Sequence, residues 1–133
     1  MDEVSVHVEV EINPTESEDK VKRAVENIFG SIPVRIKPLH KGSLLVAGAK
    51  GLEALTKLYN LLRRERIRDS ARRVLFGGLH GNMISFYLNK QVAYAGHISF
   101  SEAVAESPLG PIKVEIECED PRELIDWLAP RTA

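Results

Sequence analysis

Residues 4–12 read VSVHVEVEI and place an apolar side chain at every second position. Successive side chains of a strand point to opposite faces, so this alternation predicts a strand with one buried face. An Asn-Pro pair then ends the strand. A helix is expected to follow, with Thr15 or Ser17 as its N-cap and Gly30 just beyond its last turn.

Further strands and helices alternate irregularly along the rest of the chain. Apolar runs and alternation predict strands over residues 32–37, 43–47, 83–88, 92–100 and 112–118, and a short helical entry is the alternative for part of 92–100. Apolar residues at helical spacing predict helices from Gly51 onward, from Asp69 or Ser70 to Gly77, and from Asp120 to Ala129. We predict a single α+β domain over residues 1–133, with a mixed, mostly antiparallel sheet and helices packed on one side.

The composition is typical of a folded domain that needs no covalent or metal support. The chain has 133 residues, of which 44% are hydrophobic and 28% charged. Cys118 is the only cysteine and continues an alternating apolar pattern, so we expect it to be buried and unreactive. The chain shows no apolar run long enough to cross a bilayer and no basic, apolar leader, so a cytoplasmic location without membrane contact is expected.

The formal net charge of -1 conceals a strong division along the chain. Residues 1–29 carry three basic and eight acidic side chains, and residues 101–133 carry the same numbers. Residues 30–100 carry twelve basic and three acidic side chains. The middle of the chain is therefore a basic block between two acidic flanks.

Six arginines fall within residues 63–73, RRERIRDSARR, and form the densest part of the basic block. They are Arg63, Arg64, Arg66, Arg68, Arg72 and Arg73. In one continuous helix over residues 52–76, the arginines spaced by four would form a ridge. If Asp69 caps a new helix, the chain bends and the arginines gather around a corner. Arginine holds phosphates through paired hydrogen bonds and stacks on bases, so the cluster predicts an RNA contact; a solvated face neutralised by carboxylates is the alternative.

Two shorter polar segments are further candidates for RNA contacts. Gly48-Ala49-Lys50-Gly51 lies between a predicted strand and a predicted helix, where free N–H groups favour an anion and Lys50 adds a charge; a plain turn is the alternative. Asn89-Lys90-Gln91 groups hydrogen-bond donors and acceptors in a turn, and the neighbouring Tyr87 and Tyr94 can stack on bases. Ordinary hairpin chemistry beside core aromatics is the alternative there.

No pattern typical of an enzyme is present in the sequence. The four histidines are scattered and have no metal-ligand spacing. They are His7, His40, His80 and His97. The Gly-Lys-Ser/Thr ending of a phosphate-binding loop is absent, and no nucleophile stands beside a base in a known motif. We therefore expect a protein that is not an enzyme and binds neither cofactor nor metal.

Five sequence blocks, taken in order, resemble an archaeal family of uncharacterised proteins. The blocks are INPTE at 12–16, RIRDSAR at 66–72, LNKQ at 88–91, SPLGPI at 107–112 and LIDWLAP at 124–130. The family's fold is like that of ribosomal protein L-five, which binds 5S ribosomal RNA, and its members are described as RNA-binding on that basis and look like homodimers. The resemblance therefore implies this fold, RNA binding and a homodimer. It also implies a shared polar surface at Arg68, Asp69, Arg72, Asn89, Lys90 and Gln91.

Two functions remain open at this point. The first is a non-catalytic RNA-binding protein that holds phosphates through the central arginines and uses the Asn89-Lys90-Gln91 turn for finer contacts. The second is a homodimeric structural or interaction protein without nucleic-acid binding, whose acidic flanks neutralise its own basic middle. In that case Glu115, Glu117 or Glu123 would lie against the arginines.

Overall fold

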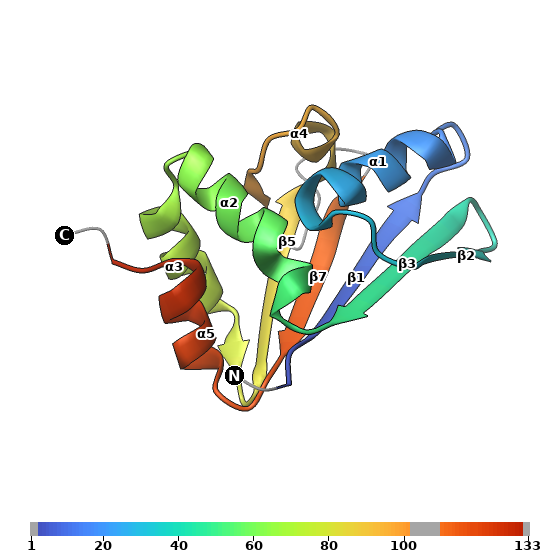
Figure 1. Cartoon of the computed structure of the whole chain (residues 1–133). Coiled ribbons are helices and arrows are strands. Elements are labelled where there is room, and N and C mark those ends of the chain that lie inside the picture. Colours follow the sequence, from blue (N-terminus) through green and yellow to red (C-terminus); the bar gives the residue numbers. More distant parts are fainter. Residues whose placement is uncertain (1–2, 102–109, 132–133) are drawn as a thin grey trace.

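The structure is a computed structural model that describes residues 3–101 and 110–131 (Figure 1). The strands are β1 (Ser5–Ile12), β2 (Val34–Pro38), β3 (Ser43–Lys50), β4 (Leu79–His80), β5 (Met83–Asn89), β6 (Phe100–Ser101) and β7 (Pro111–Glu117). The helices are α1 (Glu18–Phe29), α2 (Thr56–Arg64), α3 (Arg68–Gly77), α4 (Lys90–Tyr94) and α5 (Pro121–Leu128), and a 3-10 turn at Leu52–Leu55 precedes α2. None of these helices combines the length and apolar character that crossing a membrane would require.

The alternating stretch near the N-terminus forms the central strand of the sheet. The strand order is β2-β3-β1-β7-β5-β4, and β6 pairs with β5. Val8 of β1 lies opposite Ala47 of β3 on one side and Val114 of β7 on the other, and all three side chains are buried. Every described strand pairing is antiparallel, so the sheet is antiparallel and not mixed.

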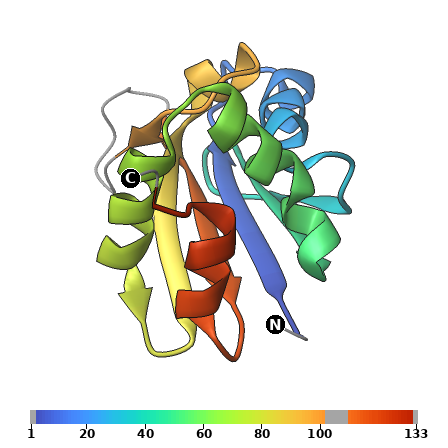
Figure 2. The ribbon, with the colours of Figure 1, turned by 60° about the vertical axis from the view of Figure 1, so that its left-hand side comes forward.

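The helices cover one face of this sheet, as the sequence predicts (Figures 1 and 2). α1 and α2 lie over β1 and its neighbours, while α3 and α5 lie side by side nearer β5. Their apolar stripes, which include Val25, Leu58, Leu75 and Leu124, pack on the buried side chains of the strands. The result is an α+β fold with one helical layer on one sheet.

The helix ends follow the local signals in the sequence. The Ser17 side chain accepts a hydrogen bond from Lys20 N–H at 3.4 Å, and Gly30 ends α1 with a φ of 78°. The Asp120 side chain accepts from Glu123 N–H at 3.0 Å at the start of α5. These caps satisfy N–H groups that a helix leaves unpaired, which explains why the predicted boundaries are confirmed here.

Two segments differ from the prediction. β3 continues to Lys50, which pairs with Ser5, so the turn expected at Gly48-Ala49-Lys50-Gly51 is confined to Gly51 with its φ of 94°. Residues 90–94 form α4 and not the start of a strand, because the Asn89 side chain accepts from Val92 N–H at 3.0 Å and caps a helix. The alternative of a short helical entry is therefore correct, but the strand predicted over residues 92–100 is wrong except at Phe100, where β6 begins.

Candidate nucleic-acid interface

The arginine-rich stretch bends between α2 and α3, so one continuous helix with a ridge of arginines does not form. α2 ends in a Schellman motif. Ile67 N–H donates to the carbonyl oxygen of Leu62 at 3.2 Å, and Arg66 N–H donates to that of Arg63 at the same distance. This motif requires a residue in the left-handed region, and Arg66 adopts it with a φ of 57°.

The start of α3 is not the one predicted. Its N-cap is Ile67, which makes no side-chain cap hydrogen bond. The prediction that Asp69 or Ser70 caps this helix is therefore wrong, because the Schellman motif already places the chain in position to begin α3. Of the two alternatives that the sequence left open, the bend is correct and the continuous helix is wrong.

Arg63 is held by the end of α5. Its guanidinium donates to the carbonyl oxygens of Leu128 and Trp127, both at 3.3 Å. The same group lies 3.3 Å from the centroid of the Tyr59 ring, and that ring stacks on Trp127 with centroids 4.6 Å apart. Carbonyls at a helix C-terminus lack intrahelical donors, so Arg63 stabilises α5 and is committed to the fold.

Arg72 has the same role from α3. Its Nη1 lies 2.7 Å from Asp126 Oδ1 and donates to the carbonyl oxygen of Ala129 at 3.3 Å. Its side chain is 18% exposed and packs beside the Phe76 ring, 4.9 Å from the centroid. Two of the six arginines therefore fasten α5 to α2 and α3.

The other four arginines lie at the end of α2, in the bend and along α3, and we name them the corner arginines. They are Arg64, Arg66, Arg68 and Arg73. Arg64, Arg66 and Arg73 are exposed and Arg68 is half-buried. Arg64 Nη2 donates to the carbonyl oxygen of Gly96 at 2.7 Å. Within the described part of the chain, Arg66, Arg68 and Arg73 form no ion pair and no side-chain hydrogen bond.

Glu65 lies at the bend but pairs with a histidine. Its Oε1 lies 2.7 Å from Nδ1 of His97, in the segment that follows α4. The hydrogen bond from His97 is the main cause that holds the pKa of Glu65 below its ordinary value. This carboxylate therefore does not neutralise the corner arginines through a direct ion pair.

The remaining predicted contacts lie in different parts of the fold. Lys50 is exposed at the end of β3, near the start of α2, whereas the bend lies at the other end of that helix. Asn89 is half-buried and uses its side chain to cap α4, and Gln91 is exposed in the first turn of α4. These side chains do not join the corner arginines in one patch.

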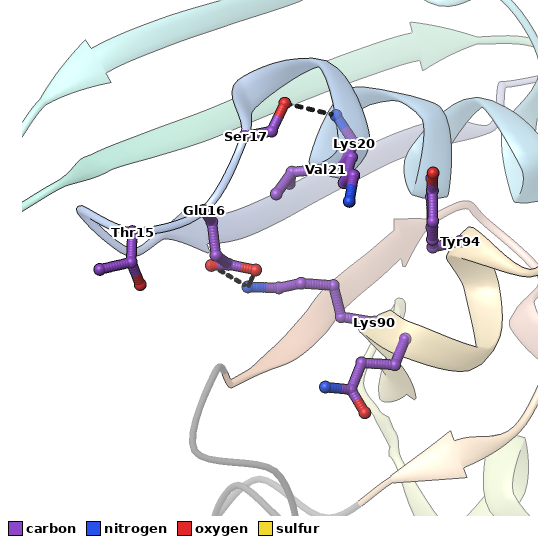
Figure 3. Close-up of a pocket in the computed structure, with 8 residues that line it drawn as sticks. Thr15, Glu16, Ser17, Lys20, Val21, Lys90 and Tyr94 are labelled. Atoms are coloured by element: carbon purple, nitrogen blue, oxygen red, sulfur yellow. Dashed lines mark hydrogen bonds and ion pairs between the residues drawn. The ribbon is translucent and has the colours of Figure 1, made fainter.

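Lys90 is buried, with an exposed side-chain fraction of 5% (Figure 3). Its ammonium donates to the carbonyl oxygen of Glu11 at 2.7 Å and to Glu16 Oε1 and Oε2 at 3.0 and 3.3 Å. An enclosed ammonium with these acceptors is not available to a phosphate, so we leave Lys90 out of the interface. Sequence reasoning missed Glu16 as its partner, because 74 residues separate the two.

The described residues contain no group of three or more His, Cys, Asp or Glu side chains placed to hold a metal ion. Cys118 is buried as predicted, and burial raises the pKa of its thiol.

Comparisons with known proteins give one consistent family. A family model described as RNA binding matches residues 5–118. The UPF0201 protein of Sulfurisphaera tokodaii is 48% identical over 126 residues, which cover 95% of this chain and 87% of that protein. The crystal structure of the UPF0201 protein from Methanococcus jannaschii has a TM-score of 0.86 and 33% identity, and the match covers 97% of this chain and 95% of that one.

The chain belongs to the UPF0201 family. The resemblance to an archaeal family seen in the five sequence blocks is thereby confirmed. The UPF0201 protein of Sulfolobus acidocaldarius, 45% identical over 96% of this chain and 88% of that protein, supports the same assignment. The description of the family model indicates an RNA-binding role for the UPF0201 family. The likeness to ribosomal protein L-five and the homodimer stay predictions.

Among the described residues of this UPF0201 chain, ion pairs join both acidic flanks to the basic block. Asp126 pairs with Arg72, and Glu16 pairs with Lys90. Glu115, one of the expected partners, instead lies 3.8 Å from Lys113 of its own strand. The flanks therefore neutralise part of the block and leave the corner arginines without a direct carboxylate partner among the described residues.

Proposed function

We propose that the chain is a non-catalytic RNA-binding protein whose corner arginines contact phosphates. The observation that carries the proposal is the set of corner arginines beside the α2–α3 bend: three of the four are exposed, and Arg66, Arg68 and Arg73 form no ion pair or side-chain hydrogen bond in the described structure. Membership of a family described as RNA-binding supports it. Free guanidinium groups bind phosphates through charge and paired hydrogen bonds and release the counterions of the nucleic acid.

The backbone at Arg66 gives this proposal independent support. The left-handed position of a Schellman motif is usually occupied by glycine, because a side chain there costs on the order of 1 kcal/mol. Arg66 occupies that position with a φ of 57°, and its side chain makes no hydrogen bond or ion pair in the described structure. Backbone strain at a residue whose side chain makes no stabilising polar contact is typical of a functional position.

Removal of three corner charges tests the proposal. The variant Arg66→Gln, Arg68→Gln, Arg73→Gln should bind unpaired RNA about tenfold more weakly at low salt, and binding should be followed between about 50 and 200 mM salt. Each phosphate contact contributes about 0.7 to the slope of log K against log salt for single strands, so the slope should fall by about 2.

The control removes an equal charge far from the bend. Arg35, Lys37 and Lys41 are exposed on or beside β2, the strand at the opposite edge of the sheet from β4. Their replacement by glutamine should leave the salt slope nearly unchanged. A wild type without affinity for RNA, or equal losses in both triple variants, would refute the proposed interface.

Two single variants separate the role of Arg66 in binding from its role in folding. Arg66→Gly should stabilise the protein by about 1 kcal/mol in urea unfolding, because glycine relieves the left-handed strain. Arg73→Gly, which removes the same charge from within α3, should destabilise it by about 1 kcal/mol. Both should weaken RNA binding to a similar extent, and a loss confined to Arg73→Gly would mean that binding follows stability and not charge.

The second candidate function is a homodimeric structural or interaction protein without RNA binding. The observation that favours it is the pairing of both acidic flanks with the basic block, at Arg72–Asp126 and Lys90–Glu16. Light scattering should then give a mass of twice 14.8 kDa together with no measurable RNA affinity. Salt-dependent RNA binding that is lost with the corner arginines would exclude it.

A further inference from the structure

A cavity of about 350 Å³ lies between the start of α1 and α4 (Figure 3). Glu16, Lys20 and Val21 line it from the α1 side, and Lys90, Gln91 and Tyr94 line it from α4. Its volume lies in the range of sites that enclose a small organic group. None of the corner arginines lines this cavity.

The charged groups in the cavity favour a neutral occupant. Glu16 and Lys90 neutralise each other through contacts of 3.0 and 3.3 Å between the ammonium and the two carboxylate oxygens. The Lys90 ammonium also donates to the backbone carbonyl oxygen of Glu11. A phosphate inside the cavity would meet the Glu16 carboxylate, and a cation would meet the Lys90 ammonium. The remaining charge among the lining residues is Lys20, whose exposed side chain reaches the cavity from α1.

The walls of the cavity suit a flat heteroaromatic ring. Tyr94 is 41% exposed, and the Lys20 ammonium lies 5.6 Å from the centroid of its ring. The amide of Gln91, exposed on the same helix, offers one donor group and one acceptor to the edge of a base. The Val21 side chain adds an apolar surface.

The backbone that carries Tyr94 is anchored to α1 before any ligand arrives. Asn27 of α1 donates through Nδ2 to the carbonyl oxygens of Ala93 and Tyr94, at 2.9 and 3.1 Å. α4 is thereby tied to the last turn of α1, outside the residues that line the cavity. A helix that is already anchored lowers the entropic cost of placing its Tyr94 ring against a base.

We propose that this cavity holds one unpaired nucleobase, stacked on Tyr94, with the attached phosphate at Lys20. The inference rests on the proposed function for the source of the base, which is an RNA strand that also contacts the corner arginines. The geometry connects the two sites, because Arg64 donates to Gly96, only two residues beyond Tyr94. A strand that crosses this segment can place phosphates at the bend and one base in the cavity.

The test compares three aromatic variants in binding to an unpaired RNA oligonucleotide. Tyr94→Ala should weaken binding about 10- to 100-fold, as expected for the loss of one stacked base, and should leave the salt slope unchanged because no charge is lost. Tyr94→Phe should bind like the wild type. Tyr87→Ala is the control. The sequence predicts Tyr87 as a second stacking residue, but it alternates with the buried side chains of β5, lies opposite Lys113 and does not line the cavity.

The outcomes distinguish this proposal from the proposed function. If RNA binds and Tyr94→Ala loses no more affinity than Tyr87→Ala, the cavity proposal is overturned while the RNA-binding proposal stands. If the wild type does not bind RNA, the proposed function fails, and adenosine monophosphate is titrated while amide NMR shifts are followed. Chemical-shift changes around α4 that Tyr94→Ala abolishes would assign the cavity to a free nucleotide. If no such changes occur, the cavity proposal is overturned.

Discussion

Lys90→Met is expected to lower the free energy of unfolding by about 3–5 kcal/mol, the usual cost of leaving a buried charge without its partner. The Lys90 and Glu16 side chains are only 5% and 11% exposed. Methionine replaces the apolar stem of the side chain but removes the ammonium that contacts both Glu16 oxygens. The carboxylate would then retain the hydrogen bonds from Asn13 N–H and Nδ2, both at 2.9 Å, with no buried cation beside it.

Urea unfolding at neutral pH measures this loss, and two variants control it. Lys20→Met removes an exposed ammonium from the same cavity and should change stability by no more than about 0.5 kcal/mol. The double variant Glu16→Gln, Lys90→Met should recover a large part of the loss, because no uncompensated charge remains. If Lys90→Met lowers the free energy of unfolding by less than about 1 kcal/mol, Lys90 and Glu16 do not form a buried ion pair in which each charge needs the other.

The Lys90–Glu16 ion pair also makes the stability of the protein depend on pH. Burial raises the pKa of Glu16, but the hydrogen bonds from Asn13 and Lys90 outweigh burial and hold the pKa below its ordinary value. A depressed pKa adds stability above the ordinary glutamate pKa of about 4.3, and this stability is lost as the pH falls through the folded-state pKa. Because Lys90→Met removes part of the depression, the stability difference between wild type and variant should shrink in acid.

Local signals explain which parts of the fold could be predicted from the sequence. The alternation of residues 4–12, the cap at Ser17 and the cap at Asp120 act within a few residues of one another, and each is present in the structure. The end of α2 has no comparable signal. Neither glycine nor proline occurs in residues 52–76, so the break at Arg66 was predicted only as one of two alternatives.

The candidate site was less predictable because charge alone does not show where a side chain points. Arg63 and Arg64 are neighbours in sequence, yet one contacts the end of α5 and the other contacts Gly96. Lys90 follows Asn89 in a polar turn but is buried, since its acceptors come from β1 and the segment before α1. Such assignments depend on contacts between residues far apart in the chain, which periodicity and local composition do not encode.

Gly78→Ala is expected to destabilise the protein by at least about 3 kcal/mol. Gly78 joins α3 to β4 and lies against β5, where there is no room for a side chain. A Cβ at this position would meet the Ser85 carbonyl oxygen at 1.8 Å and the Ser85 carbonyl carbon at 2.9 Å. Both atoms belong to the backbone of β5. That strand cannot yield easily, because Ser85 pairs with Glu115 of β7 and its N–H donates to the Gly78 carbonyl oxygen at 3.0 Å.

The preceding residue provides a matched control for this substitution. A Cβ at Gly77, the last residue of α3, would meet open space, so Gly77→Ala should be neutral or stabilising by up to about 1 kcal/mol. Thermal and urea unfolding of the two variants should therefore change in opposite directions or differ by several kcal/mol. Equal stabilities would mean that α3 does not approach β5 as closely as described. Since α3 carries Arg68 and Arg73, a folded Gly78→Ala should also weaken RNA binding, whereas Gly77→Ala should preserve it.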